Sequence, residues 1–349
     1  MATAARTLYG IQKLRAIAAF AVVFFHVFEF LHANSSLGVP RLTLGMYGVD
    51  LFFVISGFIM VQATREGETP AGFMAKRIAR IVPLYWAATL AAAAMAALVP
   101  WALQNADLSA GGFLTSLAFI PARDLSGQIM PILFVGWSLN MEMMFYVLFA
   151  LTLFLPRGMR LVALVAAMGA ILLACRYVLP ESAATTFFAR PIMLEFAAGC
   201  LIAAGLKRAG MAALVARVPM WPLQVAAFAL FGIVGVWLAG TEVGGVLVAV
   251  ASVLLVFATA GADLYRTSRP GRVLVPLGDA SYSAYLLHPM IIPVVGIAAM
   301  KLLGDSWAAA ALTLAATVVA TAIVSRLSFV YFERPSNRLL RRKMTPRPA

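Results

Sequence analysis

Long runs of apolar residues dominate the chain and constrain its fold more than any other feature. Hydrophobic residues make up 63% of the sequence and charged residues only 12%, whereas a soluble domain carries about a quarter charged residues. Lipid must therefore be the solvent of this chain. Backbone groups in lipid have to be hydrogen-bonded within their own segment, and the runs lack the alternating pattern of a barrel strand. We predict an all-α fold.

About ten of these runs are long enough to cross a bilayer as helices. The segment 112–120 is too short to span and is expected to lie at the interface or re-enter. The chain is thus predicted to be a polytopic membrane protein, with a membrane domain over 1–335 and a basic tail over 336–349. The predicted spans are 12–33, 44–64, 81–100, 133–155, 160–179, 188–206, 222–240, 243–262, 280–303 and 307–331.

The positions of the basic residues predict the orientation. Lys and Arg total 27 against 14 Asp and Glu, which gives a net charge of +13. These cations gather in alternate connections between the spans, as they do in cytoplasmic loops. Both termini are therefore expected in the cytoplasm, the basic tail could lie on anionic lipid, and the charge excess does not indicate nucleic acid. The two cysteines, Cys175 and Cys200, lie inside apolar runs and show neither a disulfide framework nor metal-ligand spacing, so no metal is expected.

Ionisable side chains within the spans are the informative residues, because each is costly in lipid unless it faces a cavity or a partner. Arg15 and His26 are eleven positions apart, so they share one face of the first helix about 16 Å apart. Asp50, Glu142 and Glu195 fall about 9–13 Å deep, at the level of His26. One polar layer is therefore expected. The alternatives are a histidine that merely packs and an arginine that only anchors the helix.

Further polar and aromatic residues allow two interpretations each. Arg77 and Arg80 share a helical face and could hold a phosphate, or they could simply anchor the helix. Ser56 and Gly57 suit close helix packing. Trp137 and Tyr146 are of the types that anchor helices at the interface.

The segment SYSAYLLHP places Tyr282 and Tyr285 on one helical face, and puts His288 near the middle of its span. Pro289 and Pro293 are expected to break or kink this helix and to free backbone carbonyls.

In this order, the motifs resemble the membrane acyltransferase 3 family, which O-acylates sugars of bacterial surface polysaccharides. The resemblance runs from about residue 9 to about residue 335 and is strongest over 10–85. The chain is similar to the stand-alone exopolysaccharide acetyltransferases. The matching pieces are Arg15-x10-His26, GVDLFFVISGF, Arg77-x2-Arg80 with Pro83 and Tyr85, Trp137-Ser138-Leu139 with Glu142 and Tyr146, and SYSAYLLHP.

The resemblance implies acetyl-CoA, or another acyl-CoA, as a donor that enters from the cytoplasm. Arg15, Arg77 and Arg80 would hold its phosphates. His26 would act as general base on the sugar hydroxyl or as the acyl-accepting nucleophile, and Glu142, or else Asp50, would orient its ring. The remaining expected donor-site residues are Ser56, Tyr85, Trp137, Tyr146, Tyr282 and His288.

The expected location is the bacterial inner membrane, with a polysaccharide or lipid-linked oligosaccharide as acceptor and with membrane lipids as further partners. Homo-oligomerisation is left open. One alternative is a transporter or flippase that binds protons or substrate through the same buried groups, although no convincing internal repeat supports it. Another is a structural subunit of an export machine, which would need no aligned histidine and carboxylates.

Overall fold

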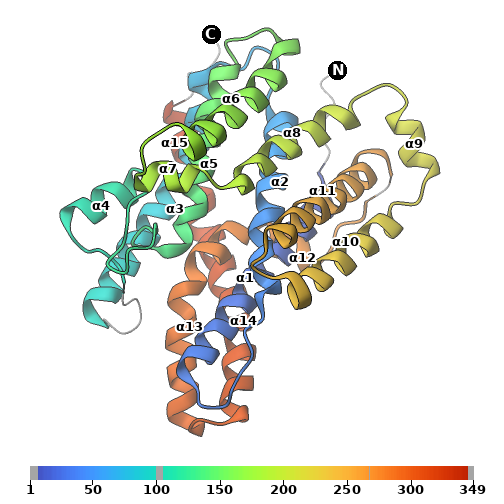
Figure 1. The fold of residues 1–349 in the computed structure, drawn as a ribbon. Helices are drawn as coiled ribbons and strands as arrows, with labels where there is room; N and C mark the ends of the chain where they lie inside the picture. The colour runs from blue at the N-terminus through green and yellow to red at the C-terminus, as the bar shows by residue number, and fades with distance from the viewer. Residues whose placement is uncertain (1–6, 100–104, 267, 345–349) are drawn as a thin grey trace.

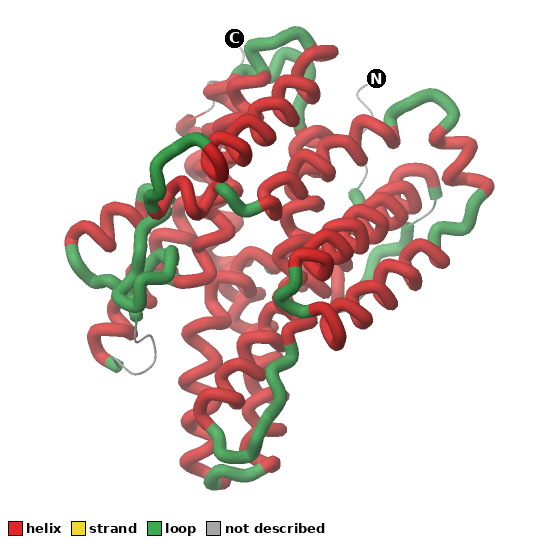
Figure 2. The backbone as a smooth tube through the Cα atoms, viewed as in Figure 1, coloured by secondary structure: helices red, strands yellow, loops and turns green. Residues whose placement is uncertain are grey.

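The protein is helical throughout the part of the chain that the structure describes. The computed structural model describes residues 7–99, 105–266 and 268–344. Within these ranges helices alternate with loops, as Figure 2 shows, and the only β-type pairing is an isolated bridge between Arg123 and Ile129. The predicted all-α class is confirmed.

Nine helices within the described ranges are long and apolar enough to cross a membrane, or ten if one bent pair is counted as a span. Short η1 (Thr43–Tyr47), η3 (Phe134–Gly136) and η5 (Val234–Leu238) adjoin α2, α5 and α10. The principal helices are α1 (Tyr9–Asn34), α2 (Gly48–Ala63), α3 (Pro70–Leu98), α5 (Trp137–Thr152), α6 (Arg157–Tyr177), α10 (Trp221–Ile233), α11 (Glu242–Tyr265), α13 (Ser281–Leu303) and α14 (Trp307–Ser328).

The connections contain short helices. The predicted non-spanning segment at 112–120 contains most of α4, and α10 and α11 pack side by side as a helical hairpin (Figure 1). These shorter elements are α4 (Ala110–Leu117), α7 (Ala183–Phe188), η4 (Pro191–Met193), α8 (Leu194–Leu206), α9 (Met211–Arg217), α12 (Leu274–Asp279), η6 (Phe329–Glu333) and α15 (Arg334–Met344).

Helix α3 begins well before the apolar run at 81–100, whose last residue lies outside the described ranges. The side chain of Thr69 accepts a hydrogen bond from the Gly72 amide, and Pro70 occupies the first helical position, which are two strong helix-start features. The polar stretch around Arg77 and Arg80 therefore belongs to the helix itself. Both arginines therefore lie in the N-terminal half of α3.

A sharp bend follows the sixth predicted span, 188–206. Here η4 leads into α8, and α9 follows at an angle of 92°. Gly210 immediately before α9 has φ +87, a left-handed conformation that glycine adopts without a Cβ penalty. The predicted span ends at Leu206, so this bend lies just beyond it and separates it from α9.

The two prolines do not break α13, and the alternative, a kink at them, stays a prediction. The helix runs from Ser281 to Leu303 without interruption, with Pro289 and Pro293 inside it. Packing against α14, which lies alongside it in Figure 1, stabilises the helix where the prolines remove backbone hydrogen bonds. Neighbouring helices commonly allow prolines within membrane spans in this way.

Helices α2 and α8 approach backbone to backbone. A Cβ atom added at Gly57 would lie 1.9 Å from the Phe196 carbonyl oxygen, and one added at Gly199 would lie 2.0 Å from that of Val54. Small residues that face one another allow membrane helices to meet this closely. The packing interpretation of Gly57 is confirmed.

The C-terminal helix returns to the start of the chain. After α14, the π-helical turn η6 leads into α15, which packs along α3. Residues from α15 and from the beginning of α1 line one cavity, so the two ends of the described chain lie at the same end of the molecule. Their cytoplasmic placement, and the division into 1–335 and 336–349, stay predictions. Residues 345–349 lie outside the described ranges.

Candidate functional site

A cavity of about 450 Å³ opens between α1, α2, α3, α5, α13 and α15. Arginines from α1, α3 and α15 line it, and the expected grouping of Arg15 with Arg77 and Arg80 is present. Its remaining polar lining consists of Thr7, Gln12, Ser56, Ser138, Glu142, Tyr146, Ser281, Tyr282, Tyr285, Asn337 and Arg341.

The arginines are held in different ways. Arg15 donates a hydrogen bond from Nη1 to Oε1 of Gln12 at 3.0 Å. Arg77 is only 8% exposed and its guanidinium lies over the ring of Phe73, 5.4 Å from the centroid. The Nε of Arg77 is buried without a hydrogen-bond partner in the described part of the chain. A buried, unpaired donor on a cavity wall favours an acceptor in the ligand.

Glu142 forms the centre of a hydroxyl cluster on one wall of the cavity. Its Oε1 accepts hydrogen bonds from Ser56 at 2.7 Å and from Tyr146 at 2.5 Å. The two donors come from α2 and from one turn further along α5, so the cluster ties these helices together.

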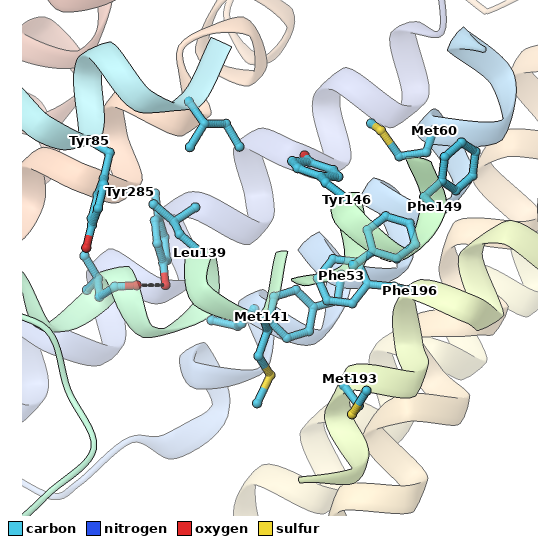
Figure 3. Close-up of a cluster of buried hydrophobic side chains, with 14 of the residues drawn as sticks. Phe53, Met60, Tyr85, Leu139, Met141, Tyr146, Phe149, Met193, Phe196 and Tyr285 are labelled. Atoms are coloured by element: carbon cyan, nitrogen blue, oxygen red, sulfur yellow. Dashed lines mark hydrogen bonds between the residues drawn. The ribbon is translucent and has the colours of Figure 1, made fainter. Parts of the chain in front are cut away.

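Tyr285 lies at the end of the cavity towards the histidines. Its hydroxyl donates to the carbonyl of Val135 at 2.9 Å and is 2.8 Å from the hydroxyl of Ser138. Figure 3 shows Tyr285 within the buried cluster, with a hydrogen bond at its hydroxyl. The ring centroid of Tyr285 lies 6.1 Å from that of His288, one turn along α13. Tyr285 therefore separates the cavity from the histidine that follows it.

His288 and His26 form a pair between α13 and α1. Nε2 of His288 is 3.1 Å from Nδ1 of His26. Nδ1 of His26 also lies 3.0 Å from the Val22 carbonyl, and Nδ1 of His288 lies 3.1 Å from the Ala284 carbonyl. His288 is fully buried, whereas His26 is half-buried beside the edges of Phe25 and Phe134.

The expected partner of His26 is wrong. We predicted a carboxylate against its ring, but the ring contacts His288, and Glu142 binds Ser56 and Tyr146 instead. The side chains of Asp50 and Glu195 lie beside each other across the close contact of α2 and α8. The single polar layer is thus three separate pairs or clusters, because depth along a helix does not specify which way a side chain points.

His26 is also not among the residues that line the cavity in the described part of the chain. The expected open path from the arginines to this ring is therefore interrupted by Tyr285 and His288. Three expected donor-site residues, His288, Tyr85 and Trp137, lie outside the lining as well. Tyr85 donates to the Ser116 carbonyl at 3.0 Å, and Trp137 packs against Phe53 with ring centroids 6.3 Å apart.

Tyr282 does line the cavity, and its hydroxyl donates to the Ile81 carbonyl at 2.8 Å. Sequence reasoning did not select Asn337 and Arg341, because the basic tail suggested only a lipid contact. Their spacing of four, on an amphipathic helix, was the available signal. Among the described residues there is no group of three His, Cys, Asp or Glu side chains that could hold a metal ion.

Comparison with known proteins gives consistent matches over nearly the whole chain. A family model described as "Acyltransferase domain" matches residues 8–326. The chain is 38% identical over 316 residues to the exopolysaccharide production protein ExoZ of Rhizobium meliloti (strain 1021), covering 89% of this chain and 94% of that protein. It is 29% identical to the acyltransferase MdmB of Streptomyces mycarofaciens, covering 96% and 92%. No solved structure gives a significant match.

Proposed function

The chain belongs to the acyltransferase 3 family of membrane proteins, and on that premise we propose that it moves an acyl group, expected to be acetyl, from acyl-CoA to a sugar hydroxyl. The proposed acceptor is a cell-surface or exopolysaccharide or its lipid-linked precursor, as the similarity to an exopolysaccharide production protein suggests. The proposed location is the bacterial inner membrane. One observation carries the proposal: an arginine-lined cavity ends at Tyr285, whose ring lies beside the His288–His26 pair.

The cavity suits the chemistry of a coenzyme A thioester. The phosphates of coenzyme A are multiply charged, and guanidinium groups bind phosphate oxygens bidentately. Arg15, Arg77 and Arg80 supply three such groups from two helices. The wall beyond them is mostly apolar and includes Phe52, Phe53 and Ile59, which fits the thin pantetheine arm. The donor would therefore lie with its phosphates near the arginines and its thioester towards Tyr285.

The hydrogen bonds of the histidine pair support His26 as the base. A carbonyl oxygen can only accept, so Nδ1 of His288 donates to Ala284 and leaves Nε2 as an acceptor. By the same reasoning Nδ1 of His26 carries a proton, which it shares between Val22 and Nε2 of His288. The remaining nitrogen of His26, Nε2, then holds the free lone pair. A base on this nitrogen needs no carboxylate partner, because His288 orients the ring.

In the proposed reaction, Nε2 of His26 takes the proton of the sugar hydroxyl as its oxygen attacks the thioester carbon. The carbon–sulfur bond breaks, the acyl group stays on the sugar oxygen, and the coenzyme A thiolate receives the proton back from His26. The other route, attack by Nε2 itself to form an acyl-imidazole, uses the same lone pair. Both routes require Tyr285 to shift so that the thioester can reach His26.

Neither Glu142 nor Asp50 has the proposed role of a triad carboxylate, which is to orient the histidine ring. Glu142 would hold the hydroxyls of Ser56 and Tyr146 at the cavity wall, where they can turn towards the thioester oxygen as charge develops on it. The proximity of Asp50 to Glu195 favours a role in packing α2 against α8 rather than in the reaction.

Mass spectrometry of surface polysaccharide provides the test. A strain that lacks the gene should lose O-acyl groups from this polysaccharide, and restoring the gene should return them. Acyl transfer from acetyl-CoA by the purified protein in detergent separates this proposal from a transporter, which would release no coenzyme A. Unchanged acylation in the strain without the gene would contradict the proposal.

A further inference from the structure

The C-terminal helix α15 forms part of the cavity wall. Asn337 and Arg341 are four residues apart, lie on one helical face, and both line the cavity together with the arginines of α1 and α3. Arg338 lies on the exposed side of the same helix and is not part of the lining. The packing of α15 along α3 fixes which face is turned inward.

Three polar atoms at this cavity are buried without a hydrogen-bond partner in the described part of the chain: the hydroxyl oxygen of Ser281, the donor Nε of Arg77 and the acceptor Oδ1 of Asn337. The last two lie on α3 and α15. Burying either atom unpaired costs free energy. A ligand that offers both an anionic oxygen and an N–H group would satisfy the two together.

The exposure of the arginines orders them along the cavity. Arg77 is 8% exposed, Arg15 and Arg80 are half-buried, and Arg341 is exposed. Arg341 therefore lies nearest the open mouth. An acyl-CoA whose thioester points inward has its 3′-phosphoadenosine at this mouth, because that group is the end of the molecule farthest from the thioester.

We infer that α15 is the recognition element for the 3′-phosphoadenosine end of the donor, an assignment that rests on the proposed function. The guanidinium of Arg341 pairs with the 3′-phosphate, and Oδ1 of Asn337 accepts a hydrogen bond from the amino group of adenine. The deeper arginines hold the pyrophosphate. The helix thus selects coenzyme A over shorter pantetheine thioesters.

Calorimetric titration of the purified full-length protein in detergent with coenzyme A and with 3′-dephospho-coenzyme A tests this inference without an acceptor. The unchanged protein should bind coenzyme A about ten-fold more tightly than the dephospho form, as expected for one charge-assisted phosphate contact. Arg341→Gln should weaken coenzyme A binding by about the same factor, and leave the dephospho form unaffected. Arg338→Gln on the outer face is the matched control and should change neither.

The outcomes are distinguishable. If the unchanged protein binds neither compound, the proposed donor is wrong. If it binds coenzyme A but Arg341→Gln keeps the preference over the dephospho form, the assignment of α15 is overturned while the proposed function stands. Retained binding of the dephospho form shows that the variant is folded. Equal effects of Arg338→Gln and Arg341→Gln that depend on added anionic lipid would mean that α15 contacts the membrane surface instead.

A second variant tests the adenine contact. Asn337→Leu should weaken binding of coenzyme A by several-fold and leave binding of 4′-phosphopantetheine, which lacks adenosine, unchanged. Equal weakening of both compounds would overturn the contact with adenine.

Discussion

Nε2 of His288 lies 3.1 Å from Nδ1 of His26, so a contact between two residues 262 positions apart in the sequence joins α13 to α1. Each ring uses its Nδ1 towards the carbonyl four residues earlier in its own helix. These contacts leave Nε2 of His26 as the unpaired basic nitrogen. The predictions that follow begin with this pair.

Replacement of His26 by alanine should abolish acylation. Removing a general base lowers the rate by roughly a hundred-fold or more, and mass spectrometry of the polysaccharide from a complemented strain measures the loss. His32→Ala, on the same helix but in an exposed position, is the control and should retain acylation. Normal acylation by a correctly inserted His26→Ala protein would rule out the catalytic role.

His288 should act as a positioning residue rather than as a donor-binding residue. His288→Leu removes the acceptor for Nδ1 of His26 and should lower kcat about ten-fold or more, with little change in the KM for acetyl-CoA. His288→Gln restores an acceptor oxygen near the same place and should recover part of kcat. Steady-state release of coenzyme A measures both parameters. A rise in KM with kcat unchanged would instead indicate a donor contact.

The hydroxyl cluster of Glu142 should contribute to stability. Glu142→Leu leaves the hydroxyls of Ser56 and Tyr146 without their acceptor and should lower the free energy of unfolding by about 1–3 kcal/mol. Glu142→Gln keeps an acceptor oxygen of nearly the same size and should cost less. Thermal unfolding in detergent compares the two variants. Identical losses would show that the hydrogen bonds contribute little.

The contact of α2 with α8 should not accept a methyl group. Gly57→Ala places a Cβ atom against the Phe196 carbonyl and should destabilise the protein by about 1–3 kcal/mol, as overpacking does. Gly205→Ala is the matched control within α8, because a Cβ atom there meets nothing within 4 Å. It should leave stability unchanged or raise it by up to about 1 kcal/mol. Unfolding in detergent with equal midpoints for the two variants would contradict this account.

Much of the candidate site could be selected from single helices. Arg15 and His26 were selected by their spacing on one helix, and Arg77 and Arg80 by theirs, because helical geometry fixes which residues share a face. The contact of Glu142 with Tyr146 follows the same rule. The pairing of His26 with His288 could not be predicted in this way, since it depends on how α1 and α13 are rotated towards each other.

The sequence by itself determined the environment, the helical class and the approximate positions of the spans. These depend on local hydropathy and on the need to pair backbone groups in lipid, which are properties of each segment alone. Only the tertiary structure decided which buried groups meet: His26 with His288, Asp50 with Glu195, and α15 with the cavity of α1 and α3. Helix rotation and packing set these contacts, and they follow from interactions between segments far apart in the chain.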